Sequence, residues 1–236
     1  FEIAYINSFG GIKMNFERLF VPGNIGRCKL KNRLIMALMG NINMADPTGR
    51  PTSKKIDYFQ ERAKGGTGLL ITGLVPVSFG IDPSVLEGDG STLFPRVDNA
   101  SRTRLVGWRD LAAAVHAYDA KIFIQLTAGL GRVGSPEPLL KGKILKSASI
   151  NRNFFLPQLP HFPLSDSKIK KIAYGFGQAA INAKTCGFDG VQIHGHEGYL
   201  IDQLTSKPWN RRKFGRYSNL FAFGVDMVES IRKTCG

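Results

Sequence analysis

Short apolar runs alternate along the chain with segments whose apolar residues recur at helical spacing. Four runs have the near-continuous apolar character of strands that are buried on both faces of a parallel sheet. They lie at 33–39, 68–75, 121–126 and 189–194. We therefore predict four parallel strands, each followed by a helix.

The helical segments carry recognisable starts and ends. The first opens at Pro51-Thr52-Ser53 and stops at Gly65-Gly66, and the second follows a capping residue, Ser101. The third covers 167–185 and ends at Gly187, and the last runs from Leu220 to Ile231 with Val228 on its inner face. Before the first strand, residues 20–33 predict a hairpin that turns around Pro22-Gly23-Asn24.

A hairpin followed by four strand–helix units predicts an α/β fold with right-handed crossovers. An open doubly wound sheet and a TIM (β/α)8 barrel both fit this order. No GxGxxG or GxxxxGK[ST] follows a strand, which weakens the case for a nucleotide-binding open sheet. The strands begin about 50 residues apart. A barrel of eight such units would need roughly 350 to 400 residues, so the chain would hold about half of one.

Half a barrel exposes two sheet edges, and exposed edges invite association. The missing half could lie outside this sequence, a second copy could supply it, or the sheet could stay open. A homo-oligomer and a C-terminal half are therefore both possible partners.

Composition narrows the class of protein. The chain has 236 residues, of which 43% are hydrophobic and 21% charged, and these ordinary values exclude wholesale disorder and collagen. We expect neither a membrane span nor a signal peptide, because no apolar run is long enough and the N-terminus lacks the pattern. The three cysteines are far apart and fit a reducing cytoplasm. The net charge of +14 suits anionic partners, but the basic residues are scattered, so we do not expect nucleic-acid binding.

Candidate chemistry follows the fourth strand, where parallel α/β folds place their active sites. His194, His196, Glu197 and Tyr199 lie within one glycine-containing turn. Such a group can hydrogen-bond a carbonyl and donate a proton. The two histidines and Glu197 could instead bind a metal, but this spacing in a turn is weak evidence and we expect none. The long segment between Thr127 and Ser165 predicts a lid or binding loop.

Four motifs in order give the chain a family resemblance. They are LKNRLIMA at 30–37, GGTGLLITG at 65–73, IQL at 124–126 followed by Gly131-Arg132, and FDGVQIHGHEGYL at 188–200. With these motifs the chain resembles the old yellow enzyme family of NADH:flavin oxidoreductases, in its 2-enoate and 2,4-dienoyl-CoA reductase branch. The resemblance covers 16–236, which would form the N-terminal half of an FMN-binding (β/α)8 barrel, and leaves 1–15 as an N-terminal extension.

The resemblance implies a role for each matching residue. Ala37, Leu38, Met39 and Gly40 would line the isoalloxazine of FMN, Gly73 would leave room for the ring, and Gln125 would pair with its pyrimidine edge. His194 and Glu197 would hold the carbonyl of the substrate, and Tyr199 would donate a proton. Arg132 and other basic residues of the long loop would suit a carboxylate or a CoA ester. His196 has no matching role.

The implied function is that of an FMN-dependent oxidoreductase, an ene-reductase. It would reduce the activated C=C bond of an α,β-unsaturated carbonyl or carboxylate, with NADH or NADPH as the reductant. The alternative is a truncated, non-catalytic half-barrel that acts as an assembly or interaction module. A barrel aldolase is disfavoured, because no lysine ends a predicted strand.

Overall fold

The computed structural model describes residues 16–40, 43–85, 94–98 and 102–236. Its centre is a four-stranded sheet in the order β3-β4-β5-β9, in which every pair is parallel. The strands are β3 (Ile35–Met36), β4 (Leu69–Pro76), β5 (Lys121–Thr127) and β9 (Gly190–Ile193). The four predicted strands are thus present and lie side by side in chain order.

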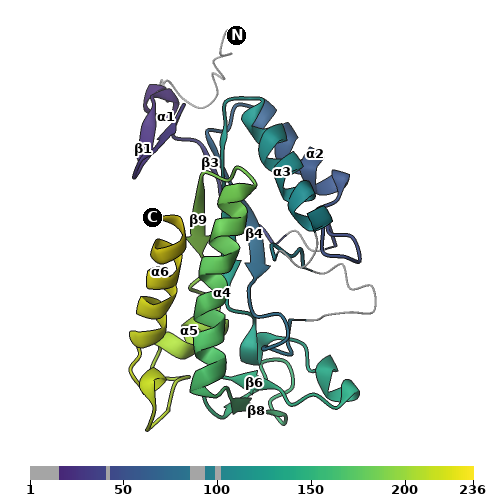
Figure 1. Cartoon of the computed structure of the whole chain (residues 1–236), viewed down its shortest axis with the longest axis vertical. Helices are drawn as coiled ribbons and strands as arrows, with labels where there is room; N and C mark the ends of the chain where they lie inside the picture. Colours follow the sequence, from purple (N-terminus) through teal and green to yellow (C-terminus); the bar gives the residue numbers. More distant parts are fainter. Residues whose placement is uncertain (1–15, 41–42, 86–93, 99–101) are drawn as a thin grey trace, which may run out of the picture.

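Helices follow each strand and cover one face of the sheet (Figure 1). They are α2 (Ser53–Lys64), α3 (Arg102–His116), α4 (Asp166–Thr185), and, after β9, the short α5 (Leu200–Thr205) and α6 (Ala222–Cys235). Ser165 caps α4, because its side chain accepts a hydrogen bond from the backbone N–H of Lys168. The predicted cap at Ser101 and the 1–15 extension lie outside the described residues.

Alternation along the strands divides the core into two parts. Leu70, Ile122 and Ile124 join the large cluster beneath the helices, together with Trp108 and Phe176. Their neighbours Leu69, Ile71 and Phe123 lie on the opposite face of the sheet, in a smaller cluster with Leu30. This second face also carries the candidate site residues of β5 and β9.

Leu30 comes from the predicted hairpin, which follows the short helix α1 (Glu17–Phe20). The hairpin pairs β1 (Gly23–Ile25) with β2 (Cys28–Leu30) in antiparallel register. Its turn is at Gly26-Arg27, so the expectation of a turn around Pro22-Gly23-Asn24 was wrong. Gly26 has φ +57°, a left-handed conformation that glycine adopts without strain, whereas Gly23 and Asn24 are strand residues.

Two expectations of burial were also wrong. The run 33–39 is not buried on both faces, since Ile35 is 47% and Met39 is 58% exposed. The reason is that β3 is an edge strand with a neighbour on one side only. On α6, Phe223 and Met227 face the core as predicted, but Val228 is 40% exposed. The stripe of side chains that this helix buries is narrower than the sequence pattern predicts.

The segment between β5 and α4 is an ordered substructure and not a simple loop. It contains two short 3-10 helices, η1 (Gly131–Val133) and η2 (Glu137–Lys141). It also contains a small sheet with the order β6-β8-β7. The strands are β6 (Lys146–Ser147), β7 (Asn151–Arg152) and β8 (Pro160–Pro163). The small sheet lies at the end of the molecule near α5 (Figure 1).

The close packing of α4 against α6 depends on Gly177. A Cβ at this position would lie 2.6 Å from the backbone oxygen of Ser230. The last described elements are η3 (Arg216–Ser218) and α6 itself. Within the described ranges, no helix combines the length and the apolar character needed to cross a membrane.

We predict that Gly177→Ala destabilises the fold by about 1–3 kcal/mol, because the two helices must separate to admit the methyl group. Gly224→Ala on α6 is the matched control. Its Cβ meets nothing within 4 Å, so it should be neutral or stabilising by up to about 1 kcal/mol. Urea unfolding of both variants measures the difference, and equal effects would contradict the close helix approach.

Candidate active site

The carboxyl ends of β4, β5 and β9 bring the candidate residues together. The register places Gln125 of β5 opposite Leu74 of β4 and Gln192 of β9. Between Ile71 and Leu74 the pairing of β4 with β5 shifts by one residue, which makes a bulge at Thr72-Gly73. There the hydroxyl oxygen of Thr72 accepts a hydrogen bond from the backbone N–H of Gln125, at 3.0 Å.

Gln125 is held in one orientation but keeps a free acceptor. Its side-chain Nε2 donates to Oε1 of Gln192 at 3.0 Å. Its own Oε1 is buried and has no hydrogen-bond partner within the part of the chain that the structure describes. A buried acceptor without a donor is costly unless a ligand supplies one.

The turn after β9 is fixed at both ends. The backbone N–H of His194 donates to the carbonyl of Leu126, which extends the pairing of β9 with β5. Beyond it, the N–H of Gly198 donates to Oδ2 of Asp202 at 3.0 Å. Glu197, between them, has φ +65°, an uncommon conformation for a residue with a side chain.

Three rings stack in this turn. The His194 ring lies 4.3 Å from that of His196 and 5.0 Å from that of Tyr199, and the planes are within 17° of parallel. His194 is 1% exposed, whereas His196 and Glu197 are exposed and Tyr199 is half-buried. The turn therefore places a buried imidazole and a phenol side by side.

Neither ring nitrogen of His194 has a hydrogen-bond partner among the described residues. Its Nε2 lies 3.4 Å from Oε2 of Glu197, which is within the distance of an ion pair but longer than a typical hydrogen bond. The pKa of His194 is lowered from its ordinary value by burial and then by His196, against the opposing effect of Glu197. The pKa of Tyr199 is raised by burial and by Glu197. At neutral pH the turn thus presents a neutral imidazole and a protonated phenol.

The same turn contains the donors of a possible metal site. The ligand atoms of His194, His196 and Glu197 all lie within 4.8 Å of one another. The two imidazole planes are only 15° apart, however, so their lone pairs do not converge on one point. His196 would have to rotate before all three could bind one ion.

The residues that would line a flavin lie around β3 and β4. Gly73 is buried at the bulge of β4, and Leu38 packs against the cluster of Leu30, Leu69 and Ile71. Ala37, Met39 and Gly40 are exposed at the free edge of the sheet. This placement leaves the carboxyl ends of β3 and β4 open to a ligand lying across them.

Arg132 points elsewhere. Its Nε donates to the backbone oxygen of Arg152 at 2.9 Å, and its guanidinium carbon lies 4.2 Å from the ring centre of Trp209. Arg132, Arg152 and Trp209 all line a cavity beside the small sheet. The structure therefore gathers His194, Glu197 and Tyr199 into one group and directs the side chain of Arg132 into a separate cavity.

Sequence reasoning overlooked two glutamines that organise the site. Gln192 holds Gln125, and the alternation of strand residues, which puts Gln192 on the face of His194, could have revealed it. Gln203 is fully buried, and its Nε2 donates to the carbonyls of Gly198 and Leu130. Only the tertiary structure shows that Gln203 joins the turn after β9 to η1.

Comparison with known proteins places this geometry in a family. Residues 18–236 match the model of the NADH:flavin oxidoreductase / NADH oxidase family. The chain is 36% identical over 229 residues to a cinnamate reductase of Clostridium sporogenes, covering 95% of this chain and 33% of that protein. It is 33% identical over 225 residues to an NADH oxidase of Thermoanaerobacter brockii, covering 94% and 33%.

A solved structure shows the same architecture. The old yellow enzyme of Trypanosoma cruzi superposes with a TM-score of 0.76 at 27% identity, over 94% of this chain and 63% of that one. The parallel sheet is therefore part of a TIM barrel, as the family resemblance implies. The chain spans about a third of the length of the two curated relatives named above. Because the family model covers nearly all of it, the chain belongs to the NADH:flavin oxidoreductase / NADH oxidase family of FMN-linked enzymes.

Proposed function

We propose that this chain carries the substrate-binding and proton-donating part of an ene-reductase. The substrate would be an α,β-unsaturated carbonyl or carboxylate compound, and NADH or NADPH would be the reductant. The observation that carries the proposal is His194, a buried imidazole with no hydrogen-bond partner among the described residues, stacked beside Tyr199. The similarity to a cinnamate reductase, named for an unsaturated acid, supports this substrate class.

The residues present fit FMN at the strand ends. The free Oε1 of Gln125 is a buried acceptor, and the pyrimidine edge of a flavin offers an N–H beside its carbonyl groups. Ala37, Leu38, Met39 and Gly40 would flank the ring, and Gly73 at the bulge would give it room. When bound, FMN supplies the hydride that the alkene accepts at its β-carbon.

His194 and Tyr199 divide the remaining work. A neutral imidazole of His194 donates its N–H to the substrate carbonyl oxygen, where negative charge develops. A carboxylate accepts hydrogen bonds and donates none, so Glu197 would act through its influence on the two neighbouring rings. It raises the pKa of Tyr199, which keeps the phenol protonated, and it offsets only part of the lowering of the His194 pKa by burial. Tyr199 then protonates the α-carbon of the substrate.

A second candidate function is a non-catalytic assembly module. It is favoured by the two free edges of the sheet, β3 and β9, and by the exposed Ile35 and Met39 at the first of them. Such edges suit association with another chain or with further barrel strands. Flavin binding separates the two functions, because an assembly module needs no flavin.

We predict that the purified protein takes up FMN and becomes yellow. Gln125→Ala should weaken FMN binding about tenfold, or about 1.4 kcal/mol, because it removes the amide that faces the ring. Gln178→Ala, at a partly buried position of α4, is the matched control and should bind as wild type. Flavin fluorescence titration gives both affinities. A protein that takes up no FMN would rule out the reductase and favour the assembly module.

Tyr199→Phe should slow alkene reduction about 10²- to 10⁴-fold, the usual contribution of a positioned acid. Reduction of the flavin by nicotinamide should be unchanged, because the phenol takes no part in it. Stopped-flow absorbance separates the two half-reactions. Tyr174→Phe, which alters an exposed tyrosine of α4, is the control. Equal losses in both half-reactions would show that Tyr199 has a structural role only.

Glu197→Gln should lower the pKa of Tyr199 and lower further the pKa of His194, because the carboxylate of Glu197 raises both pKa values and the variant removes it. His196→Gln should instead raise the pKa of His194, since His196 depresses it. NMR titration of the imidazole and phenol ring protons measures the pKa of Tyr199 in Glu197→Gln and the pKa of His194 in both variants. Shifts of the same sign in the two variants would contradict the proposed electrostatics of the turn.

A further inference from the structure

The cavity that holds the side chain of Arg132 has a volume of about 690 Å³ and lies between the small sheet and the chain after α5. Its volume is within the range of about 300–1,000 Å³ that is typical of small-molecule sites. Three arginines line it, Arg132, Arg152 and Arg211, and none of its lining residues is acidic. The cavity therefore concentrates positive charge without a carboxylate in its wall to balance it.

Two of these arginines have free donors. Arg132 uses its Nε to reach the backbone oxygen of Arg152, and its terminal nitrogens have no acceptor among the residues that the structure describes. Its guanidinium carbon lies 4.2 Å from the ring centre of Trp209 and 5.8 Å from that of Phe154. Arg152 is exposed, and within the same described ranges its guanidinium has no partner. Two forked cations with free donors are suited to a phosphate group.

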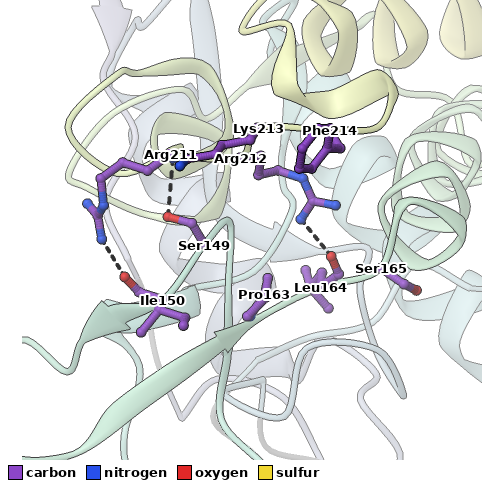
Figure 2. Close-up of a pocket in the computed structure, with 9 residues that line it drawn as sticks. All are labelled: Ser149, Ile150, Pro163, Leu164, Ser165, Arg211, Arg212, Lys213 and Phe214. Carbon is purple, nitrogen blue, oxygen red and sulfur yellow. Dashed lines mark hydrogen bonds between the residues drawn. The ribbon is translucent and has the colours of Figure 1, made fainter.

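The neighbouring cavity provides the contrast (Figure 2). It also has a volume of about 690 Å³, and Arg211, Arg212 and Lys213 line it. There Arg212 donates to the carbonyls of Ala148 and Leu164 and pairs with Asp166. Arg211 donates to the carbonyls of Pro208 and Ile150. These two guanidinium groups hold the fold together, so they are not available to a ligand.

The cavity lined by Arg132 and Arg152 is also preformed. The backbone N–H of Phe154 donates to the carbonyl of Arg132 at 2.9 Å. The buried side chain of Asn153 donates to the carbonyl of Gly134 at 3.0 Å and accepts hydrogen bonds from the N–H groups of Phe155 and Leu156. The backbone of Arg132 and of the aromatic wall therefore keeps its position without a ligand, which reduces the entropy lost on binding.

Aromatic surface completes the site. Phe154 is 58% exposed although it belongs to the cavity wall, and its ring meets that of Phe155 edge to face at 5.1 Å. An exposed ring 5.8 Å from the guanidinium carbon of Arg132, in a cavity that Arg152 also lines, can stack on a planar aromatic ligand while the cations hold its charge. A bare phosphate would leave this surface uncovered, and a neutral aromatic compound would leave the charge unbalanced.

We propose that this cavity binds a phosphorylated aromatic ligand of the nucleoside monophosphate class. Arg132 and Arg152 hold the phosphate, and Phe154 stacks on the base. The site uses no residue of the proposed reductase centre, so it stands whether or not the flavin reaction does.

Isothermal titration with AMP, adenosine and inorganic phosphate tests the proposal on the full chain. AMP should bind at least tenfold more tightly than either fragment. Adenosine binding as well as AMP would overturn the phosphate site, and phosphate binding as well as AMP would overturn the aromatic part. No binding of AMP would overturn the proposal altogether.

Arg152→Gln should weaken AMP binding at least tenfold. This side chain is exposed and unpartnered among the described residues, so the fold should not depend on it. Lys213→Gln makes the same charge change beside the neighbouring cavity and should alter AMP binding less than twofold. Equal weakening by both variants would show attraction to a basic surface and not a site. Arg132→Lys, which keeps the charge but removes the fork, should also weaken AMP binding, and unchanged affinity would exclude bidentate contact.

Discussion

The parallel register of β5 and β9 is the constraint on which the candidate site depends. Asp189 sets this register where the strands begin. Its backbone N–H donates to the carbonyl of Ile122, and its carboxylate accepts from the N–H of Ile122 and contacts His116 and Lys121. Burial by itself would raise the pKa of Asp189, but the hydrogen bonds from His116 and the N–H of Ile122, together with Lys121, hold it below its usual value. A slip of one residue would turn every side chain of β9 to the other face.

Gly190 makes the same register possible by close approach. A Cβ here would lie 2.6 Å from the ring of Phe123, its partner across the strands. With Phe123 seated against Gly190, Gln125 lies opposite Gln192 two residues later, and the backbone of His194 reaches Leu126. Packing at the start of the strands therefore decides which polar groups meet at their ends.

Those polar groups are left unsatisfied where a ligand would lie. Oε1 of Gln125, the hydroxyl of Thr127 and both nitrogens of His194 are buried without hydrogen-bond partners in the described chain. Each such group costs about 1–3 kcal/mol. The proposed flavin and substrate would remove part of this cost at Gln125 and His194. Gln203 connects the turn after β9 to the cavity of Arg132. Its side chain donates a hydrogen bond to the carbonyl of Gly198 and accepts one from the backbone N–H of Arg132.

The sequence by itself determined the order of strands and helices, the parallel sheet and the grouping of His194, Glu197 and Tyr199. These features are local, since periodicity defines each element and the three side chains are at most five residues apart. The tertiary structure alone decided the rest. It exposed Ile35 by leaving β3 at an edge, gave the segment before α4 its own sheet, and joined Gln125 to Gln192. It also turned Arg132 toward Trp209, because contacts between residues distant in the chain depend on packing that no local pattern records.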